Sequence, residues 1–139
     1  MATLAPKVKI TFKTCDISRL ASTEQVGDEI IAEVDRLDIV MLKAGIMAVD
    51  AAVSVDGYEI QMATNHLGHA MLIRRLMPLL KSTAKQYGEA RVVNLTSIAY
   101  TQAPRAGVEF ATLTTPQKEL GGLIPGGKYS RHGQSKLAH

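Results

Sequence analysis

The segment from Arg131 to Ala138 holds the pair of side chains best suited to acid–base chemistry. His132 and Lys136 are four residues apart, a spacing that places both on one face of a helix. An imidazole has an ordinary pKa of about 6.5 and beside an ammonium tends to be neutral, so a general acid–base role for His132 is chemically reasonable. We expect the helix that carries this pair to begin near Tyr129.

The first part of the chain predicts a strand, a helix and a second strand. Residues 8–12 alternate apolar and polar side chains, as a half-buried strand does. Ser22 with Gln25 forms a capping-box pattern that predicts a helix start, and an apolar stripe follows over 26–37. The apolar run 39–42 suits a buried parallel strand. This order predicts a βαβ unit and an α/β layered fold.

The remainder continues the alternation of helix and strand. The pattern over 56–82 is helical, and we expect Pro78 to kink or end that helix. A third strand is predicted over 91–95. The long connection over 98–128 suits a lid or binding loop, and we interpret its glycine pairs, between 121 and 127, as turn residues and not a phosphate loop. The elements together predict a single domain over residues 1–139.

Composition and charge argue against several kinds of binding partner, namely nucleic acid, a membrane and a metal ion. The net charge of +3 and pI near 9.1 come from dispersed lysines and arginines, so we predict no binding to nucleic acid. No run approaches the roughly 18 apolar residues of a membrane span, and the one cysteine, Cys15, fits a reducing, cytoplasmic location. His66 and His69 are three residues apart without an evident third ligand, so we predict no metal site.

Several landmarks together resemble the short-chain dehydrogenase/reductase family. The family's catalytic helix carries Tyr-x-x-x-Lys, often as Tyr-Gly-Gln-Ser-Lys-Leu-Ala-Asn. Residues 133–138 reproduce that motif, but His132 stands at the tyrosine position. The segment 65–69, Asn-His-Leu-Gly-His, is similar to the retinol-dehydrogenase-like members and the fungal reductases of secondary metabolism.

The resemblance implies catalytic roles for four residues. Ser97, after the third strand, would orient a substrate carbonyl, and Asn65 would kink its helix and hold a relay water. Lys136 would bind the nicotinamide ribose, and His132 would stand in for the phenol as acid–base group. The implied cofactor is NADP or NAD, and the implied substrate is a small ketone or secondary alcohol.

The resemblance also implies residues around the cofactor. Asp16 would hydrogen-bond the adenine; taken alone it fits a helix-entry cap equally well, but the family context favours the cofactor role. Lys43 and Gly45 stand in the family's Asn-Ala-Gly, where Lys43 either alters the site or lies exposed at the strand end. Arg74 would face the cofactor phosphates, a role that Arg75 fits equally. Lys136 completes this set.

One family element is missing from the chain. The Gly-rich turn Thr-Gly-x-x-x-Gly-x-Gly lies upstream of the aspartate matched by Asp16, and residues 1–15 contain no glycine. We therefore expect a partial, doubly wound, three-layer Rossmann-like fold that lacks the first two strands and the last strands, with exposed strand edges. We predict a truncated oxidoreductase, or pseudoenzyme, that is inactive by itself. The alternative is a noncatalytic module that forms a homo-oligomer through the helices around Asn65 and Lys136.

Overall fold

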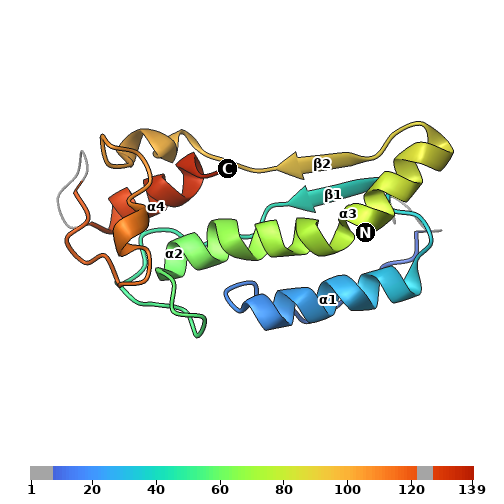
Figure 1. Cartoon of the computed structure of the whole chain (residues 1–139), viewed down its shortest axis with the longest axis horizontal. Coiled ribbons are helices and arrows are strands. Elements are labelled where there is room, and N and C mark those ends of the chain that lie inside the picture. Colours follow the sequence, from blue (N-terminus) through green and yellow to red (C-terminus); the bar gives the residue numbers. More distant parts are fainter. Residues whose placement is uncertain (1–7, 122–126) are drawn as a thin grey trace, which may run out of the picture.

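A computed structural model describes residues 8–121 and 127–139 of the chain. Figure 1 shows short strands running side by side, long helices beneath them, and a C-terminal helix packed at one end. The elements, in chain order, are α1 (Leu20–Glu33), β1 (Ile39–Leu42), α2 (Ile60–Met62), the π-helix η1 (Ala63–Leu67), α3 (Gly68–Tyr87), β2 (Arg91–Asn94), the 3-10 helices η2 (Ile98–Gln102) and η3 (Phe110–Thr112), and α4 (Lys128–Leu137).

The two strands form a parallel pair, which confirms the α/β fold in partial form. β1 pairs with β2 in the register Ile39↔Arg91 to Leu42↔Asn94. Helices α1 and α3 pack against each other and against one face of this sheet. Apolar side chains of both helices meet that face, and the buried centre consists of Val40, Leu42, Leu76 and Leu80.

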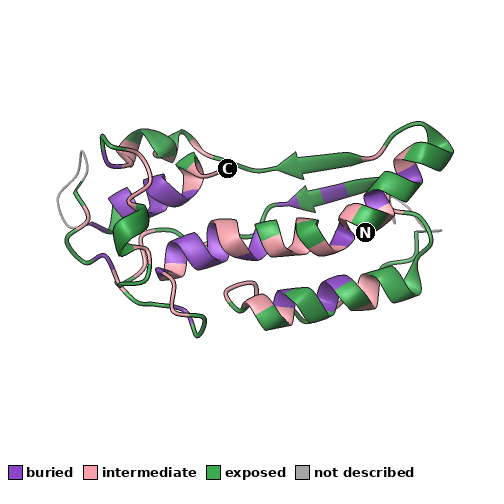
Figure 2. Cartoon of the chain, in the orientation of Figure 1, coloured by how far each residue is buried: buried purple, intermediate pink, exposed green. Residues whose placement is uncertain are grey.

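The opposite face of the sheet is open. Figure 2 shows burial concentrated on α4, on the start of the α2–η1–α3 helix and where α1 and α3 meet, whereas the strands are mostly exposed. Ile39 is 55% exposed and Met41 is 64% exposed. The run 39–42 is therefore half-buried, and our expectation of a fully buried strand was wrong.

The strand predicted over residues 8–12 does not form. Its backbone is irregular, and Val8, Ile10 and Phe12 are 64%, 70% and 89% exposed. The alternating pattern is present, but a strand also needs a neighbour, and the only sheet in the described part of the chain consists of β1 and β2. Lys13 holds the segment beside α1 through Glu29 at 3.3 Å and Glu33 at 2.5 Å.

Helix α1 begins two residues before the predicted capping box. Its first amide, Leu20 N, donates to the carboxylate of Asp56 at 2.9 Å. Ser22 instead lies inside the helix, and its hydroxyl accepts a hydrogen bond from Asp16 N at 3.0 Å. The helix ends at Glu33, before the end of the apolar stripe. A cap contributed by a distant residue cannot be detected in the local pattern.

Pro78 does not end its helix, so of the two outcomes that we predicted, a kink or a helix end, the second does not occur. Helix α3 continues through it to Tyr87. Pro78 is exposed, whereas Leu76 and Leu80 on either side are buried in the core. The hydrogen bond that proline cannot make therefore faces solvent, and the packing of its neighbours holds the helix together.

The C-terminal part agrees more closely with the sequence. β2 occupies Arg91–Asn94, and α4 begins at Lys128 as expected. The connection between them contains two short 3-10 helices and no strand in its described part. The interpretation of the glycine pairs as turn residues falls largely on 122–126, outside the described residues.

Candidate active site

Asn65 connects the loop after β1 to the π-helix η1 through hydrogen bonds to Ile46. It lies in the π-helix η1 and is fully buried. Its Oδ1 accepts from Ile46 N at 2.8 Å, and its Nδ2 donates to Ile46 O at 2.9 Å and to Ser135 Oγ at 2.8 Å. Both amide hydrogens of Asn65 thus have protein acceptors. The Asn65 side chain thus bonds both backbone groups of Ile46, as a neighbouring strand would, and joins the loop to α4 through Ser135.

His132 contacts the same loop carbonyl. Its Nδ1 lies 3.1 Å from Ile46 O. A carbonyl oxygen only accepts, so Nδ1 carries the hydrogen and donates it to Ile46 O. The nearby Asn65 Nδ2, at 3.4 Å, already donates to two other atoms. The neutral ring therefore keeps its lone pair on Nε2, the atom that can exchange a proton with a ligand.

Burial keeps this imidazole neutral. The His132 side chain is almost completely enclosed, and desolvation lowers its pKa below the ordinary 6.5. The hydrogen bond to Ile46 O acts in the opposite direction, and the Lys136 ammonium lowers the pKa further. At neutral pH the ring is therefore uncharged, and Nε2, which keeps its lone pair, is a weak base.

Lys136 lies where the carboxyl ends of both strands meet. Its Nζ donates to Leu95 O at 3.1 Å, and its own carbonyl accepts from Thr96 Oγ1 at 2.8 Å. A Cβ at Gly45, after β1, would lie 3.8 Å from Lys136 Nζ and 2.9 Å from Asn65 Oδ1. Burial lowers the pKa of the Lys136 ammonium. Glycine is needed at position 45 because the two polar groups approach the backbone closely.

Ser97 is the next residue in the chain after Leu95 and Thr96, which both hydrogen-bond to Lys136. Its Oγ accepts from Ala99 N at 3.2 Å and caps η2, which leaves the hydroxyl hydrogen for another acceptor. Helix α4 packs on η2 at Gly133, where a Cβ would lie 2.6 Å from both Ala99 O and Ala103 N. This close packing sets η2, and with it Ser97, against the helix that carries His132 and Lys136.

A buried ion pair that the sequence did not reveal anchors α4. Arg131 Nε lies 3.2 Å from Glu59 Oε1, and the side chains are 2% and 0% exposed. Arg131 also donates to Val49 O at 2.8 Å and to Gln117 O at 3.3 Å. Desolvation raises the pKa of Glu59, while hydrogen bonds from the Met62 and Gln61 amides and the Arg131 charge oppose that rise.

Three glutamines extend the network. Gln61 accepts from Ala48 N at 2.9 Å and donates to the carbonyl of Lys128, the first residue of α4. Gln134 donates to Gln117 Oε1 at 2.8 Å and accepts from Glu109 N at 2.8 Å. Ala48 and Gln117 have positive φ angles of 54° and 46°, a costly backbone state that such bonds hold in place. The partners lie far apart in sequence, so no local spacing marks them.

The structure places Asp16 in a local turn. Its Oδ1 accepts from Ser18 N at 3.1 Å and from Ser18 Oγ at 2.7 Å, and these bonds lower the pKa of the carboxyl group. The turn packs against α3 at Gly68, where a Cβ would collide with Ile17 O. Asp16 therefore closes a turn three residues before Arg19, the N-cap residue of α1, and the bonds of its carboxylate are to Ser18 and not to the helix amides.

Lys43 and Arg74 are exposed and do not join the cluster around Lys136. Lys43 follows β1 as an exposed strand-end lysine. Arg74 lines a small cavity of about 220 Å³ with Leu20 and Tyr58, while Arg75 pairs with Asp28 and Glu24 of α1. Of the predicted site residues, Asn65, His132, Lys136 and Gly45 gather at one place. Ser97 follows two residues after Leu95, whose carbonyl contacts Lys136.

The starts of helices α1 and α2 are poorly suited to binding phosphate. A pyrophosphate is normally held by backbone amides at a helix N-terminus that follows a Gly-rich turn. At the start of α1 the Leu20 amide binds the Asp56 carboxylate, and at the start of α2 the Met62 amide binds Glu59 Oε2 at 2.8 Å. Both carboxylates would repel an anion. These two helix starts therefore do not fit the phosphates of a dinucleotide.

Three histidines gather beyond Lys136. The His139 ring lies 5.6 Å from His66 and 5.9 Å from His69, and Asn94 Nδ2 lies 2.7 Å from His139 Nδ1. Burial, with smaller contributions from Lys136 and the other two rings, lowers the pKa of His139 to about 4. Among residues 8–121 and 127–139, no group of three or more potential ligands has the arrangement to hold a metal ion.

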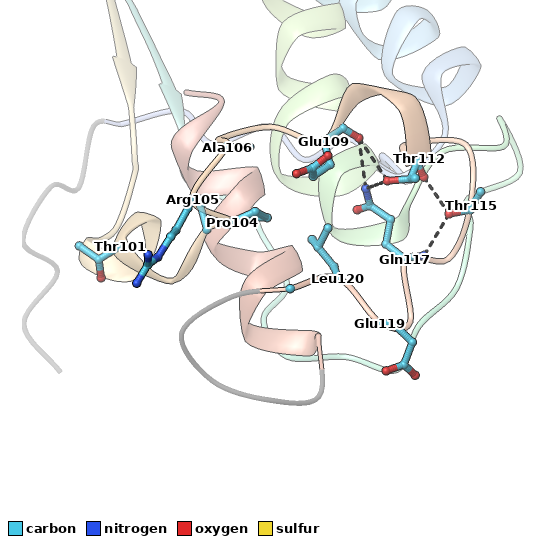
Figure 3. A pocket seen from close by; sticks show the side chains of 12 residues that line it. Thr101, Pro104, Arg105, Ala106, Glu109, Thr112, Thr115, Gln117, Glu119 and Leu120 are labelled. Atoms are coloured by element: carbon cyan, nitrogen blue, oxygen red, sulfur yellow. Dashed lines mark hydrogen bonds between the residues drawn. The ribbon is translucent and has the colours of Figure 1, made fainter.

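The long connection also encloses a cavity of about 870 Å³. Figure 3 shows it between Thr101 and Leu120, with Gln117 hydrogen-bonded to Glu109 and Thr112 in its wall. Its lining does not include Ser97, His132 or Lys136. The cavity is thus separate from the cluster, and Gln117 links the two through Gln134.

Comparisons with known proteins agree with this geometry. The family model for short chain dehydrogenases matches residues 2–112. An uncharacterised oxidoreductase of Schizosaccharomyces pombe is 38% identical over 132 residues, which cover 94% of this chain and 37% of that protein. The chain belongs to the short-chain dehydrogenase/reductase family.

Solved structures show the same fold. A protein from Mycobacterium paratuberculosis, crystallised without an assigned function, has a TM-score of 0.64 at 29% identity, covering 89% of this chain and 38% of that one. Pseudomonas aeruginosa RhlG, solved in complex with NADP, has a TM-score of 0.59 at 25% identity, covering 89% and 41%. The chain spans about two fifths of the length of each of these three proteins.

The partial Rossmann-like fold and the use of nicotinamide cofactors in the family are thus supported. Within the described ranges, no helix has the length and apolar character needed to cross a membrane.

Proposed function

We propose that this chain provides the proton-transfer half of a short-chain dehydrogenase site for a small ketone or secondary alcohol. The observation that carries the proposal is the fixed orientation of His132, whose Nδ1 donates to Ile46 O and whose Nε2 keeps the lone pair. Lys136 and Ser97 lie at the same carboxyl edge of the sheet. A substrate oxygen at this edge would meet one proton acceptor, one cation and one hydroxyl donor.

Each residue has a distinct task in this proposal. Ser97 donates its hydroxyl hydrogen to the substrate oxygen, where negative charge develops. His132 Nε2 accepts the hydroxyl proton of an alcohol, and Lys136 stabilises the oxygen as that proton leaves. Asn65 orients both the loop and the ring through Ile46. Because the pKa of His132 is lowered, the ring is neutral at neutral pH and holds no extra proton to donate in the opposite, ketone-reducing direction.

We further propose that the chain by itself does not turn over substrate. In the family a nicotinamide dinucleotide supplies or accepts the hydride. Asp16 is bonded to Ser18, Arg74 lies apart, and the amides at the starts of α1 and α2 bind the chain's own carboxylates. Lys136 and Gly45 remain as the residues beside which a nicotinamide ribose would lie. A role in secondary metabolism and a cytoplasmic location stay predictions.

Cofactor titration tests this proposal. NADPH and NADH are added separately to the purified chain, and binding is followed by cofactor fluorescence and by calorimetry. A dinucleotide-binding dehydrogenase of the same family, measured in parallel, serves as the positive control. We expect no saturable signal from this chain. Saturable binding of either cofactor at one equivalent per chain would contradict the proposal.

The noncatalytic alternative also has a structural observation in its favour. The apolar residues of 8–12 and of the open sheet face are exposed, whereas most of α4, the helix first considered for dimerisation, is buried in its own chain. Contacts with another polypeptide would therefore involve the strands and not that helix.

A further inference from the structure

Two buried amide side chains, four residues apart, join the same segments of the chain. Gln61 of α2 and Asn65 of η1 are both fully buried, and their spacing places them close to one face of the α2–η1 helix. Asn65 bonds Ile46 in the loop after β1 and Ser135 in α4. Gln61 makes a second connection between that loop and α4, at the other end of the helix.

Gln61 bonds main-chain atoms on both sides of the His132 contact. Its Oε1 accepts from Ala48 N at 2.9 Å, two residues after Ile46, and its Nε2 donates to Lys128 O at 3.0 Å. In an α-helix each amide donates to the carbonyl four residues earlier, so Lys128 O is also the helical acceptor of the His132 amide. Gln61 therefore holds both the loop that supplies the acceptor and the helical turn that carries the ring.

The loop requires such a bond at Ala48. Its φ angle is 54°, in the left-handed region, which costs free energy for a residue that has a Cβ. Ala48 and Ile46 are both only partly buried, so the surrounding side chains do not enclose this backbone. The bond from Gln61 to the Ala48 amide stabilises the left-handed state. With it the bond stabilises the direction of the Ile46 carbonyl, two residues earlier.

We propose that Gln61 is a positioning residue for His132. By holding the Ala48 amide and the Lys128 carbonyl, it keeps Ile46 O opposite Nδ1, so that the ring hydrogen stays on Nδ1 and the lone pair on Nε2. The inference rests on the proposed function, because it concerns the proton-accepting atom of the same site. Gln61 acts through main-chain atoms and not on the reacting atoms themselves.

The tautomer of His132 in a Gln61→Met chain tests this inference. Methionine has nearly the length and volume of glutamine but neither of its hydrogen-bonding groups, so packing is kept while both bonds are lost. Nitrogen NMR of ¹⁵N-histidine-labelled chain at neutral pH measures the tautomer, and His132→Gln assigns the signals. We expect the ratio of Nδ1–H to Nε2–H to fall about fivefold, the change that one hydrogen bond of typical net strength makes.

Gln134→Met is the matched control. Gln134 is also a fully buried glutamine with a bond at each end of its amide group, and it lies two residues after His132 on α4. Its partners, Glu109 and Gln117, are not in the loop after β1. Urea denaturation should show a loss of stability similar to that of Gln61→Met, while the His132 tautomer stays as in the parent chain.

Glycine at position 48 provides a rescue. Glycine adopts a positive φ without the steric cost, so Ala48→Gly added to Gln61→Met should recover a large part of the Nδ1–H tautomer. Loss of packing alone would give no such recovery. If Gln61→Met does not fold, Gln61→Asn takes its place. Its side chain is one methylene shorter and cannot reach both partners at once, so the tautomer should shift in the same direction.

Three outcomes would overturn the inference. They are a parent-like tautomer in the Gln61 variants, an equal shift in Gln134→Met, and no recovery on adding Ala48→Gly. All of these readings are made without cofactor or substrate, so the result of the cofactor titration leaves them unchanged. A parent chain whose His132 hydrogen lies on Nε2 would instead contradict the proposed function itself, before any variant is compared.

Discussion

At the scale of single residues, Gly45 is the point at which the loop after β1 comes closest to Asn65. A Cβ there would lie 2.9 Å from Asn65 Oδ1. We expect Gly45→Ala to lower the free energy of unfolding by about 1–3 kcal/mol. The side-chain amide of Asn65 is fully buried and hydrogen-bonded to Ile46 and Ser135, so it has little room to move away from the added methyl group. Urea denaturation measures the change. Gly121→Ala, where an added Cβ meets no atom of residues 8–121 and 127–139 within 4 Å beyond its immediate chain neighbours, is the control and should leave stability nearly unaltered.

Arg131 and Glu59 form the second critical contact. Arg131→Met leaves the Glu59 carboxylate buried without its cation, and we expect a loss of about 3–5 kcal/mol at neutral pH. Adding Glu59→Gln should restore a large part of it, because the uncompensated charge is then gone. A double variant no more stable than Arg131→Met alone would show that the ion pair is not the source of the loss.

The pKa of Glu59 adds a pH test to the same pair. Burial raises this pKa, so the folded state favours the protonated carboxyl group. The penalty of Arg131→Met should therefore shrink as the pH falls from neutral toward the pKa of Glu59. Urea denaturation of both proteins at a series of pH values measures it, and a penalty independent of pH would contradict the assignment.

At the scale of elements, α3 carries a proline that its packing tolerates. Pro78 is exposed inside α3, and alanine there would restore one backbone hydrogen bond. Proline is about 3 kcal/mol less favourable than alanine within a helix, so we expect Pro78→Ala to stabilise the protein by about 1–3 kcal/mol. Thermal unfolding followed by circular dichroism measures it. An unchanged or lowered melting temperature would mean that the proline ring makes a contact that this account overlooks.

Elements whose position is set by neighbouring residues were predicted well from the sequence, and elements set by distant residues were not. The positions of β1 and α4 were predicted closely. The apolar run that marks β1 and the family motif that marks α4 each lie within a few consecutive residues. The start of α1 depends on Asp56, in a distant loop, and was misplaced. Residues 8–12 have a strand pattern, but pairing is a property of the neighbour as well.

The candidate site shows the same division. Asn65, Ser97, His132 and Lys136 could be found because they occupy recognisable motif positions. The Arg131–Glu59 pair and the three glutamines could not, because polar side chains on a short helix predict exposure until the covering loops are known. Burial of α4 is the feature that sequence alone left undetermined.

At the scale of the whole molecule, the histidines make stability depend on pH. The pKa values of His66, His69, His132 and His139 are all lowered in the folded state, that of His139 to about 4. A base with a lowered folded pKa is protonated first in the unfolded chain. Stability should therefore be full above pH 6.5 and fall as the pH drops toward 4.

Denaturation by urea at several pH values in this range measures that fall. Glu59 acts in the opposite sense, so the histidine contribution is isolated by comparison with His139→Gln, which should show a shallower loss. Parallel curves for the two proteins would contradict the contribution assigned to His139.

The state of the His132 ring tests the central claim most directly, because the proposed chemistry requires its lone pair on Nε2. Nitrogen NMR of the chain labelled with ¹⁵N-histidine separates the tautomers, and His132→Gln identifies the signals. We predict a neutral ring at neutral pH with the hydrogen on Nδ1, as the contact with Ile46 O demands. A ring that carries its hydrogen on Nε2, or one that is already charged, would contradict the account.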